Sequence, residues 1–450
     1  MMQTSQRDSF GSRFGVIAAA AGSAIGLGNI WRFPYVLGEN GGGIFLLIYL
    51  ILVAMVGIPV MLSEFTIGRS TQRNPYGAFR RLAPDSPWYL VGMMGIVAAF
   101  MILAFYTVVA GWTLEYLYQA VINGFRGKSS DEINVMFDHF RAGTFRPVLW
   151  FLIFMGMTSW IVVSGVRKGI EKYTKVLMPF LFLLILVMDI RAVTLPGAGE
   201  GLKFLFRPDF SKVSAETILE ALGQGFFSLS IGMGTLITYG SYISKEERLG
   251  NAALNVTLAD TLIAVLAGIA IFPAVFAFGI EPGAGTGLVF KTLPLIFQEM
   301  PGGYLFSIIF FLLLAIAALT STISVLAVIV AFFSEELRIS RRAATLLASA
   351  AVGVLGIFAA GSWGWFSGFQ LLGQNFFGIL DFTTANILLP VGGFFIVIFV
   401  GWFMGTDRVR AELSNQGRLQ VAYLPVFTFL VRFVAPLAIA LVFLNGLGWI

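Results

Sequence analysis

Long stretches without a charged residue limit what this chain can fold into more than any other feature. Eight such runs, of 20 to 38 residues each, contain no Asp, Glu, Lys or Arg. A helix that crosses the hydrocarbon core of a bilayer needs about 20 mainly apolar residues. The runs therefore predict a protein that crosses a membrane many times. They are Gly41–Ser63, Gly92–Leu114, Pro147–Val166, Ala221–Ser244, Thr261–Ile280, Met300–Ser334, Ala343–Leu380 and Phe382–Thr406.

Three further apolar segments complete the set of predicted spans. The longest uncharged run, Ala343–Leu380, is long enough to contain one helix and the start of the next. The three segments are Phe14–Leu37, which contains Arg32, Val176–Met188, and Tyr423–Trp449, which contains Arg432. Ala343–Gly361 is then the ninth helix, and the tenth lies at about 373–404. The sequence therefore predicts an all-α polytopic membrane protein with eleven transmembrane helices.

Composition excludes the main soluble classes. The chain is 58% hydrophobic and 12% charged, whereas soluble domains carry about 25% charged residues. A water-soluble enzyme, a nucleic-acid binder and a disordered scaffold are therefore disfavoured. There is no cysteine and one histidine, His139, which removes most metal and thiol chemistry. We expect His139 to lie in a surface loop rather than to act as a ligand.

The distribution of positive charge predicts the orientation. If the N-terminus is cytoplasmic, 18 of the 29 Lys and Arg residues fall in cytoplasmic segments, as the positive-inside rule requires. Eleven spans then place the C-terminus outside. The same rule explains the net charge of +5 without an acidic macromolecular partner. The polar stretches at about 124–146 and 191–214 fall outside, and 281–302 is expected to be an outer re-entrant or capping loop.

Two of the predicted spans contain matching glycine-rich interruptions. Gly22–Asn29 lies in the first span and Ser228–Gly234 in the sixth, and Ala-Ile-Gly-Leu-Gly matches Ser-Ile-Gly-Met-Gly in character. Because five helices separate them, the repeat must be inverted in the membrane. Interrupted helices at corresponding positions indicate a transporter's binding site, where unwound backbone holds ions and substrate. The alternative is that these glycines only allow close helix packing.

At this point the sequence resembles the neurotransmitter:sodium symporter family over essentially its whole length, and especially bacterial members that import hydrophobic amino acids. The resemblance implies five helices against an inverted five, with helix 11 peripheral. One transporter domain, 1–450, would hold repeat one at about 12–190, repeat two at about 215–404 and helix 11 at about 424–446. The matching motifs are Gly26–Tyr35, Glu39–Gly43, Gly57–Pro59, Glu64, Gly68–Arg69, Tyr106, Gly111–Trp112, Ile237–Tyr242 and Leu319–Ser321.

The resemblance implies two sodium sites. Sodium is a hard cation that prefers oxygen ligands, and the implied ligands are carbonyls, hydroxyls, one amide and one carboxylate. The first site would use Ala24, Asn29, Ser228 and Asp260. The second would use Gly22, Ile25, Ala317, Thr320 and Ser321. The alternative for Thr320 and Ser321 is packing, with the hydroxyls bonded to their own helix backbone.

Asp260 is informative because a carboxylate inside a span costs about 2.5–3.5 kcal/mol on insertion scales. Relatives usually carry a neutral asparagine around this position, and chloride-dependent members bind an anion nearby. A fixed carboxylate supplies that charge, so we expect transport that does not require chloride. Asn255, in the same helix, is the competing sodium ligand. Alternatively, Asp260 is a charge near the helix end that water solvates.

The resemblance also implies a substrate pocket between the two interruptions. Tyr106 would bond the substrate carboxylate, and flexible Met233 replaces an aromatic residue found in some relatives. No acidic residue faces the pocket in this alignment, which disfavours a monoamine and favours hydrophobic L-amino acids, including tryptophan and leucine. The implied substrate-binding residues are Ser23, Ala24, Leu27, Gly28, Ile102, Tyr106, Phe227, Ser228, Ser230, Met233, Ser321 and Val325.

Gates follow from the same resemblance. Arg32 and Asp381 would pair across an outer vestibule with Phe227 as a lid. The inner gate would consist of Arg7, Phe10, Tyr242 and Glu335. Gly169 and Pro179, near the cytoplasmic start of helix 5, have the spacing that the family associates with local unwinding toward the second sodium site.

These expectations describe a symporter in a bacterial cytoplasmic membrane that carries two sodium ions inward with each amino acid by alternating access. A sodium channel is one rival, but no filter sequence is visible. A membrane-embedded enzyme would need clustered His, Asp or Cys within spans. A substrate sensor on the same fold is the third rival. The sequence leaves the substrate ranking and the oligomeric state open.

Overall fold

The computed structural model describes residues 10–279 and 288–449. Among these residues, nine helical stretches are long and apolar enough to cross a membrane. A tenth is a pair, Phe14–Ala24 and Gly28–Glu39, bent by 50° at the break between its halves. Helices α11 (Ala215–Ser228) and α12 (Thr235–Gly240) form another interrupted segment. The bent pair and this segment occupy the places of the predicted first and sixth spans.

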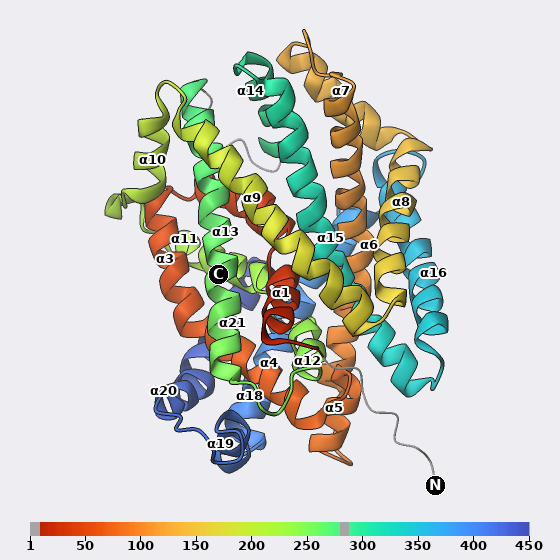
Figure 1. Ribbon diagram of the computed structural model, residues 1–450, viewed down its shortest axis with the longest axis vertical. Coiled ribbons are helices and arrows are strands. Elements are labelled where there is room, and N and C mark those ends of the chain that lie inside the picture. The colour runs from red at the N-terminus through yellow and green to blue at the C-terminus, as the bar shows by residue number, and fades with distance from the viewer. Residues whose placement is uncertain (1–9, 280–287, 450) are drawn as a thin grey trace.

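Helices account for almost all of the architecture (Figure 1). The elements of the first half are α1 (Arg13–Ala24), η1 (Gly28–Arg32), α2 (Phe33–Glu39), α3 (Gly43–Leu52), η2 (Val53–Gly57), α4 (Ile58–Thr71), α5 (Pro75–Leu82), α6 (Tyr89–Val121), α7 (Ser130–Ala142), α8 (Arg146–Val163), η3 (Val166–Glu171), α9 (Lys172–Val193), α10 (Ala198–Phe206) and η4 (Phe210–Lys212).

The second half begins with α11 and α12. The remaining elements are α13 (Leu249–Ala277), η6 (Leu288–Thr292), α14 (Leu293–Glu299), α15 (Gly303–Glu336), α16 (Arg341–Ala360), η7 (Gly361–Trp363), β1 (Gln370–Leu371), β2 (Gln374–Asn375), α17 (Phe376–Phe382), η8 (Thr383–Leu388), α18 (Leu389–Ile398), η9 (Phe399–Phe403), α19 (Thr406–Leu413), α20 (Leu424–Phe429), η10 (Leu430–Val434) and α21 (Ala435–Gly446).

Helix α15 forms the centre of the molecule. Its most apolar 18-residue window is completely buried, whereas the corresponding windows of α8 and of the α20–α21 segment are 39% and 33% buried. Figure 1 shows α9 crossing diagonally over this central region, and α1 lies near the middle of the view. A helix that is apolar all round is typical of a position surrounded by other helices. The outer helices expose apolar side chains, as lipid contact requires.

The polar connections contain short helices where the sequence predicts loops. The stretch 124–146 holds α7, whose N-cap Ser129 and third residue Glu132 form a capping box, so His139 is exposed on a helix rather than in a loop. The stretch 191–214 holds α10. Of 281–302, residues 288–299 are helical, so the expectation of a loop is wrong there, and 281–287 lie outside the described residues.

A small antiparallel hairpin precedes α17. Gln370 pairs with Asn375 and Leu371 with Gln374. The two turn residues, Leu372 and Gly373, both have positive φ, 52° and 75°, as a two-residue hairpin turn of this kind requires. In Figure 1, α7 and α14 lie at one end of the molecule and α5 and α19 at the other, so short helices cap both ends of the long ones.

Candidate functional site

The first span is interrupted at the predicted place. Helix α1 ends at Ala24, Ile25 is extended (φ −71°, ψ 107°), and a π-helical turn begins at Gly28. Two polar side chains hold the break open. The Leu27 N–H donates to the Tyr106 hydroxyl at 2.8 Å, and the Gly26 N–H donates to Asn29 Oδ1 at 3.0 Å. Backbone groups that would bond within a continuous helix are therefore bonded to side chains instead.

The sixth span is interrupted between α11 and α12. The backbone of the interruption has positive φ at Ser230, Gly232 and Gly234 (56°, 85° and 75°), and glycine adopts such values without strain. The buried carboxylate of Glu64 accepts the Gly232 N–H at 2.8 Å. The Ser230 hydroxyl donates to the Ser23 carbonyl at 3.0 Å, so one hydrogen bond joins the two interruptions directly.

A cavity lies between the interruptions, α6 and α15. Every predicted substrate residue lines it except Leu27 and Ser228, and Gly26 and Leu103 line it in addition. A Cβ at Gly26 would lie 2.6 Å from the Tyr106 hydroxyl, so glycine leaves room there. Within the described part of the chain, the buried Ser23 hydroxyl has no hydrogen-bond partner. A buried hydroxyl without a partner favours a ligand that forms a hydrogen bond with it.

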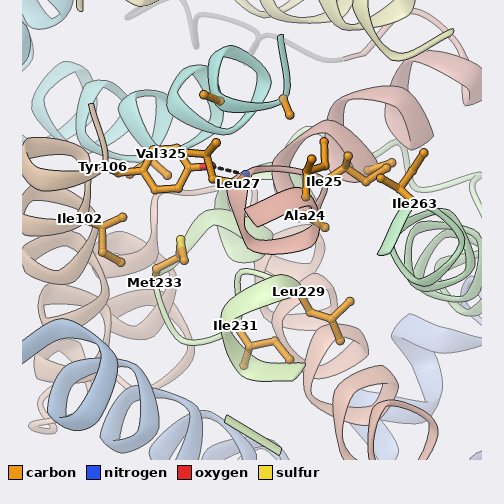
Figure 2. Close-up of a cluster of buried hydrophobic side chains, with 14 of the residues drawn as sticks. Ala24, Ile25, Leu27, Ile102, Tyr106, Leu229, Ile231, Met233, Ile263 and Val325 are labelled. Atoms are coloured by element: carbon orange, nitrogen blue, oxygen red, sulfur yellow. Dashed lines mark hydrogen bonds between the residues drawn. The ribbon is translucent and has the colours of Figure 1, made fainter. Parts of the chain in front are cut away.

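The cavity has an apolar side and a polar side. Figure 2 shows Ile102, Tyr106, Met233 and Val325 gathered on one side of Leu27, with the Tyr106 hydroxyl directed at the Leu27 backbone. The polar side consists of the interrupted backbone and the serine hydroxyls. This division fits a molecule that is apolar at one end and charged at the other.

Three of the four predicted residues of the first sodium site form one buried cluster. The Asn29 amide donates to Asp260 Oδ1 at 2.7 Å and to Ser228 Oγ at 3.0 Å, and the Ser228 hydroxyl donates to Asp260 at 2.9 Å. The Tyr49 hydroxyl donates to the same carboxylate at 3.4 Å. Asn255 is exposed on α13, so of the two candidates on this helix only Asp260 belongs to the cluster.

The predicted residues of the second sodium site also meet. Thr320 Oγ1 lies 3.0 Å from the Ala317 carbonyl and 3.4 Å from the Ile25 carbonyl. Ser321 Oγ lies 3.3 Å from the same Ile25 carbonyl. A Cβ at Gly22 would lie 3.4 Å from the Thr320 Cβ, so that residue is adjacent. These contacts bring carbonyl and hydroxyl oxygens from α1 and α15 together, which is the donor set that a hard cation prefers.

An aromatic vestibule lies next to the cavity and shares Tyr106 and Phe227 with it. Arg32 and Asp381 both line the vestibule, but within the described ranges no ion pair joins them. Arg32 instead donates to Gln224 Oε1 at 3.0 Å and lies 5.0 Å from the centre of the Phe227 ring. The motifs did not identify Gln224, which also donates to the Gly28 carbonyl at 2.9 Å.

An ion-pair network from α7 and η6 borders the vestibule, where Arg141 and Lys291 line it. Asp138 of α7 accepts from Arg141 at 2.5 Å and from Lys291 of η6 at 3.2 Å. Partial burial raises the pKa of Asp138, but the hydrogen bonds from Lys291 and Arg141 outweigh this effect, so its pKa is below the usual value. Asp138 therefore pairs as a carboxylate with one cation of α7 and one of η6.

The predicted inner residues are partly brought together. The Phe10 ring packs edge-on against the Tyr242 ring, with 5.9 Å between the ring centres. The backbone N–H of Phe10 donates to the Tyr242 carbonyl at 3.3 Å. Glu335 accepts from the backbone and the side chain of Asn74, both at 3.0 Å. Arg7 lies outside the described residues. Gly169 lies in η3 and Pro179 within α9, so the segment between them is helical in this structure.

Known proteins resemble this chain over nearly its full length. The profile of the Sodium:neurotransmitter symporter family matches residues 7–134 and 139–448. An uncharacterized sodium-dependent transporter of Bacillus subtilis is 40% identical, with 97% of each chain covered. Another, from Haemophilus influenzae, is 38% identical, with 98% of each covered.

A solved structure confirms the predicted fold. The crystal structure of MhsT in complex with L-phenylalanine is 45% identical and covers 98% of this chain and 100% of its own, with a TM-score of 0.90. These relatives are transporters and not enzymes. The chain is therefore a multi-pass membrane protein and a sodium-dependent transporter, and it belongs to the sodium:neurotransmitter symporter family.

Proposed function

We propose that this transporter imports hydrophobic L-amino acids, both aliphatic and aromatic, together with two sodium ions. The observation that carries the proposal is the cavity between the two helix interruptions. Its apolar side, with Ile102, Met233 and Val325, suits a hydrophobic side chain. Its polar side, with the unpaired Ser23 hydroxyl and the interrupted backbone, suits an amino group and a carboxylate.

The first sodium ion would lie at the cluster of Asn29, Ser228 and Asp260, with the Ala24 carbonyl as a further ligand. The second would lie among Gly22, Ile25, Ala317, Thr320 and Ser321. Because the Asp260 carboxylate supplies a permanent negative charge beside the first site, transport would not require chloride. Each sodium ion that moves inward across 100 mV contributes about 2.3 kcal/mol, so two ions drive strong accumulation.

The surrounding residues would alternate access. On the outer side, Arg32 would leave Gln224 and pair with Asp381 while Phe227 covers the cavity. On the inner side, the segment around Phe10 would leave Tyr242, and the helix between Gly169 and Pro179 would unwind. The protein would lie in a bacterial cytoplasmic membrane, with its N-terminus inside. Helices 1–5 (about 12–190) and 6–10 (about 215–404) would be the two inverted repeats.

Uptake into proteoliposomes tests the proposal. Labelled leucine and tryptophan should accumulate when sodium is higher outside, and should only equilibrate when sodium is equal on both sides. Replacement of chloride by gluconate should leave the rate unchanged. Binding without accumulation would show a sensor, and sodium flux without substrate would show a channel. Loss of uptake in gluconate would contradict chloride independence alone.

A further inference from the structure

A buried carboxylate ties the beginning of the chain to the cytoplasmic start of helix 5. Glu171 is the last residue of η3 and is 2% exposed. Its two oxygens accept the Gly11 N–H at 2.7 Å and the Ser12 hydroxyl at 3.1 Å. Burial of a carboxylate is costly unless its oxygens are bonded. Glu171 therefore depends on the N-terminal segment, and the segment is in turn held by Glu171.

Ser12 links this contact to the start of helix 1. Its side-chain oxygen caps α1 by accepting the Gly15 N–H at 3.0 Å while its hydroxyl donates to Glu171. The neighbouring Phe10 contacts Tyr242, just beyond the end of α12. Phe10 and Ser12 therefore join three elements, namely α1, the end of α12 and η3, at the cytoplasmic side.

The packing at Gly15 shows that this contact is tight. A Cβ on Gly15 would lie 2.2 Å from Glu171 Oε1 and 2.5 Å from its Cδ. Glycine costs about 1 kcal/mol relative to alanine within a helix. An alanine at this position would favour α1 and would displace the Glu171 side chain from its Cγ outward. The substitution therefore separates the carboxylate from its partners.

Glu171 keeps one partner when the segment leaves. Lys175 Nζ lies 2.5 Å from Glu171 Oε1, four residues later on the same helix. An ion pair within one helix cannot hold two elements together, but it compensates the carboxylate charge once Gly11 and Ser12 have moved away. Farther along α9, Met178 lies against Gly22, one of the residues of the proposed second sodium site. The start of this helix therefore borders the route from that site to the cytoplasm.

We infer that Glu171 is a positioning residue of the transport cycle. Its bonds to Gly11 and Ser12 hold the N-terminal segment across the cytoplasmic ends of α1 and α9, and their release opens the route to the second sodium site. This inference rests on the proposed function, because it assigns Glu171 to the inward-opening step of sodium-coupled transport. The sequence motifs did not point to this residue.

The absence of cysteine from the sequence allows a direct test. Met178→Cys introduces a single thiol beside Gly22, and its reaction with a membrane-impermeant maleimide is followed in inside-out vesicles. In the otherwise unchanged protein, the reaction should be slow in sodium plus leucine and faster in potassium. In Gly15→Ala and in Glu171→Gln, the rate in sodium should rise about tenfold, the factor that one charge-assisted hydrogen bond supplies.

Two matched variants separate this role from general loosening. Lys175→Met removes the partner that Glu171 keeps after the segment has left, so the rate in sodium should not rise. Glu115→Gln neutralises another carboxylate that is 2% exposed. Glu115 on α6 pairs with Arg146 on α8, so this variant should leave the reaction rate unchanged. Thermal unfolding of each purified variant reports whether the fold is retained.

The outcomes are distinguishable. If the cysteine reporter reacts at the same rate in sodium and potassium, the proposed sodium coupling fails, and the inference fails with it. If the reporter responds to sodium but Gly15→Ala and Glu171→Gln stay slow, only the inference about Glu171 is wrong. An equal increase in Glu115→Gln or Lys175→Met would also overturn it, because neither variant breaks the link to the N-terminal segment.

Discussion

At the scale of single residues, the proposed first sodium site depends on one carboxylate with three neighbours. Asp260 accepts from Asn29, Ser228 and Tyr49, which lie on three other elements. Because this carboxylate is fully buried, its charge acts on any cation bound beside it without screening by water. The charge, rather than the shape of the side chain, should therefore determine sodium affinity.

Asp260→Asn tests this directly. The asparagine keeps the size of the side chain but removes the charge, so the sodium concentration for half-maximal uptake should rise about tenfold or more, which corresponds to about 1.4 kcal/mol. Sodium titration of leucine uptake measures the change. Asp209→Asn, at an exposed aspartate bonded to Ser211, is the control. An unchanged sodium titration in Asp260→Asn would place the first ion elsewhere.

Met233 provides a second test at this scale, because it lines the apolar side of the cavity. Met233→Phe replaces a flexible side chain with a rigid ring and narrows the space available to a large substrate. The ratio of kcat/KM for tryptophan to that for leucine should fall about tenfold, within the range for small changes in an apolar pocket. Met55→Phe, on the exposed face of η2, should leave the ratio unchanged. A higher ratio would contradict the assigned pocket.

Sequence motifs were sufficient to name most of the residues around the cavity, because the family signature lies in the two interruptions themselves. They did not identify Tyr49 or Gln224. Tyr49 lies in an apolar helix and Gln224 in an amphipathic one, and neither belongs to a recognisable sequence motif. Their contacts form only when three helices pack together. Arg32, which was expected to pair with Asp381, lines the vestibule, and its hydrogen-bond partner in this structure is Gln224, 192 residues away in sequence.

At the scale of elements, the helix interruptions are stabilised from outside. Glu64 on α4 accepts the Gly232 N–H, so a side chain from another helix satisfies the interrupted backbone between α11 and α12. The sequence did not predict the short helices α7, α10 and α14, because they are too short to be recognised as spans. For α7 a signal was available, since Ser129 and Glu132 have the spacing of a capping box. Neither α10 nor α14 carries such a signal.

Glu64→Ala tests the support of the sixth span. The buried Gly232 N–H would lose its acceptor, which costs about 1–3 kcal/mol, so both the melting temperature in detergent and the rate of uptake should fall. Glu220→Ala, on the same interrupted segment but lining a separate pocket, should have the same melting temperature as the unchanged protein. Normal melting and normal uptake in Glu64→Ala would show that the interruption needs no support from α4.

At the scale of the whole molecule, the arrangement of long helices capped by short ones makes the orientation testable. His139 on α7 and Arg410 on α19 are both exposed, and the proposed topology puts them on opposite sides of the membrane. In a chain without cysteine, His139→Cys should react with an impermeant maleimide added to intact cells. Arg410→Cys should react only after permeabilisation. The reverse pattern would invert the proposed orientation.

The complete burial of the central window of α15 has a consequence for how this sequence tolerates change. A helix with one face toward lipid accepts substitutions there, so its mutational sensitivity should vary with a period of about 3.6 residues. This pattern is expected for α8, of which less than half is buried in the corresponding window. Saturation mutagenesis of α15 should instead show uniform sensitivity from turn to turn, because every side of the helix is packed against another part of the protein.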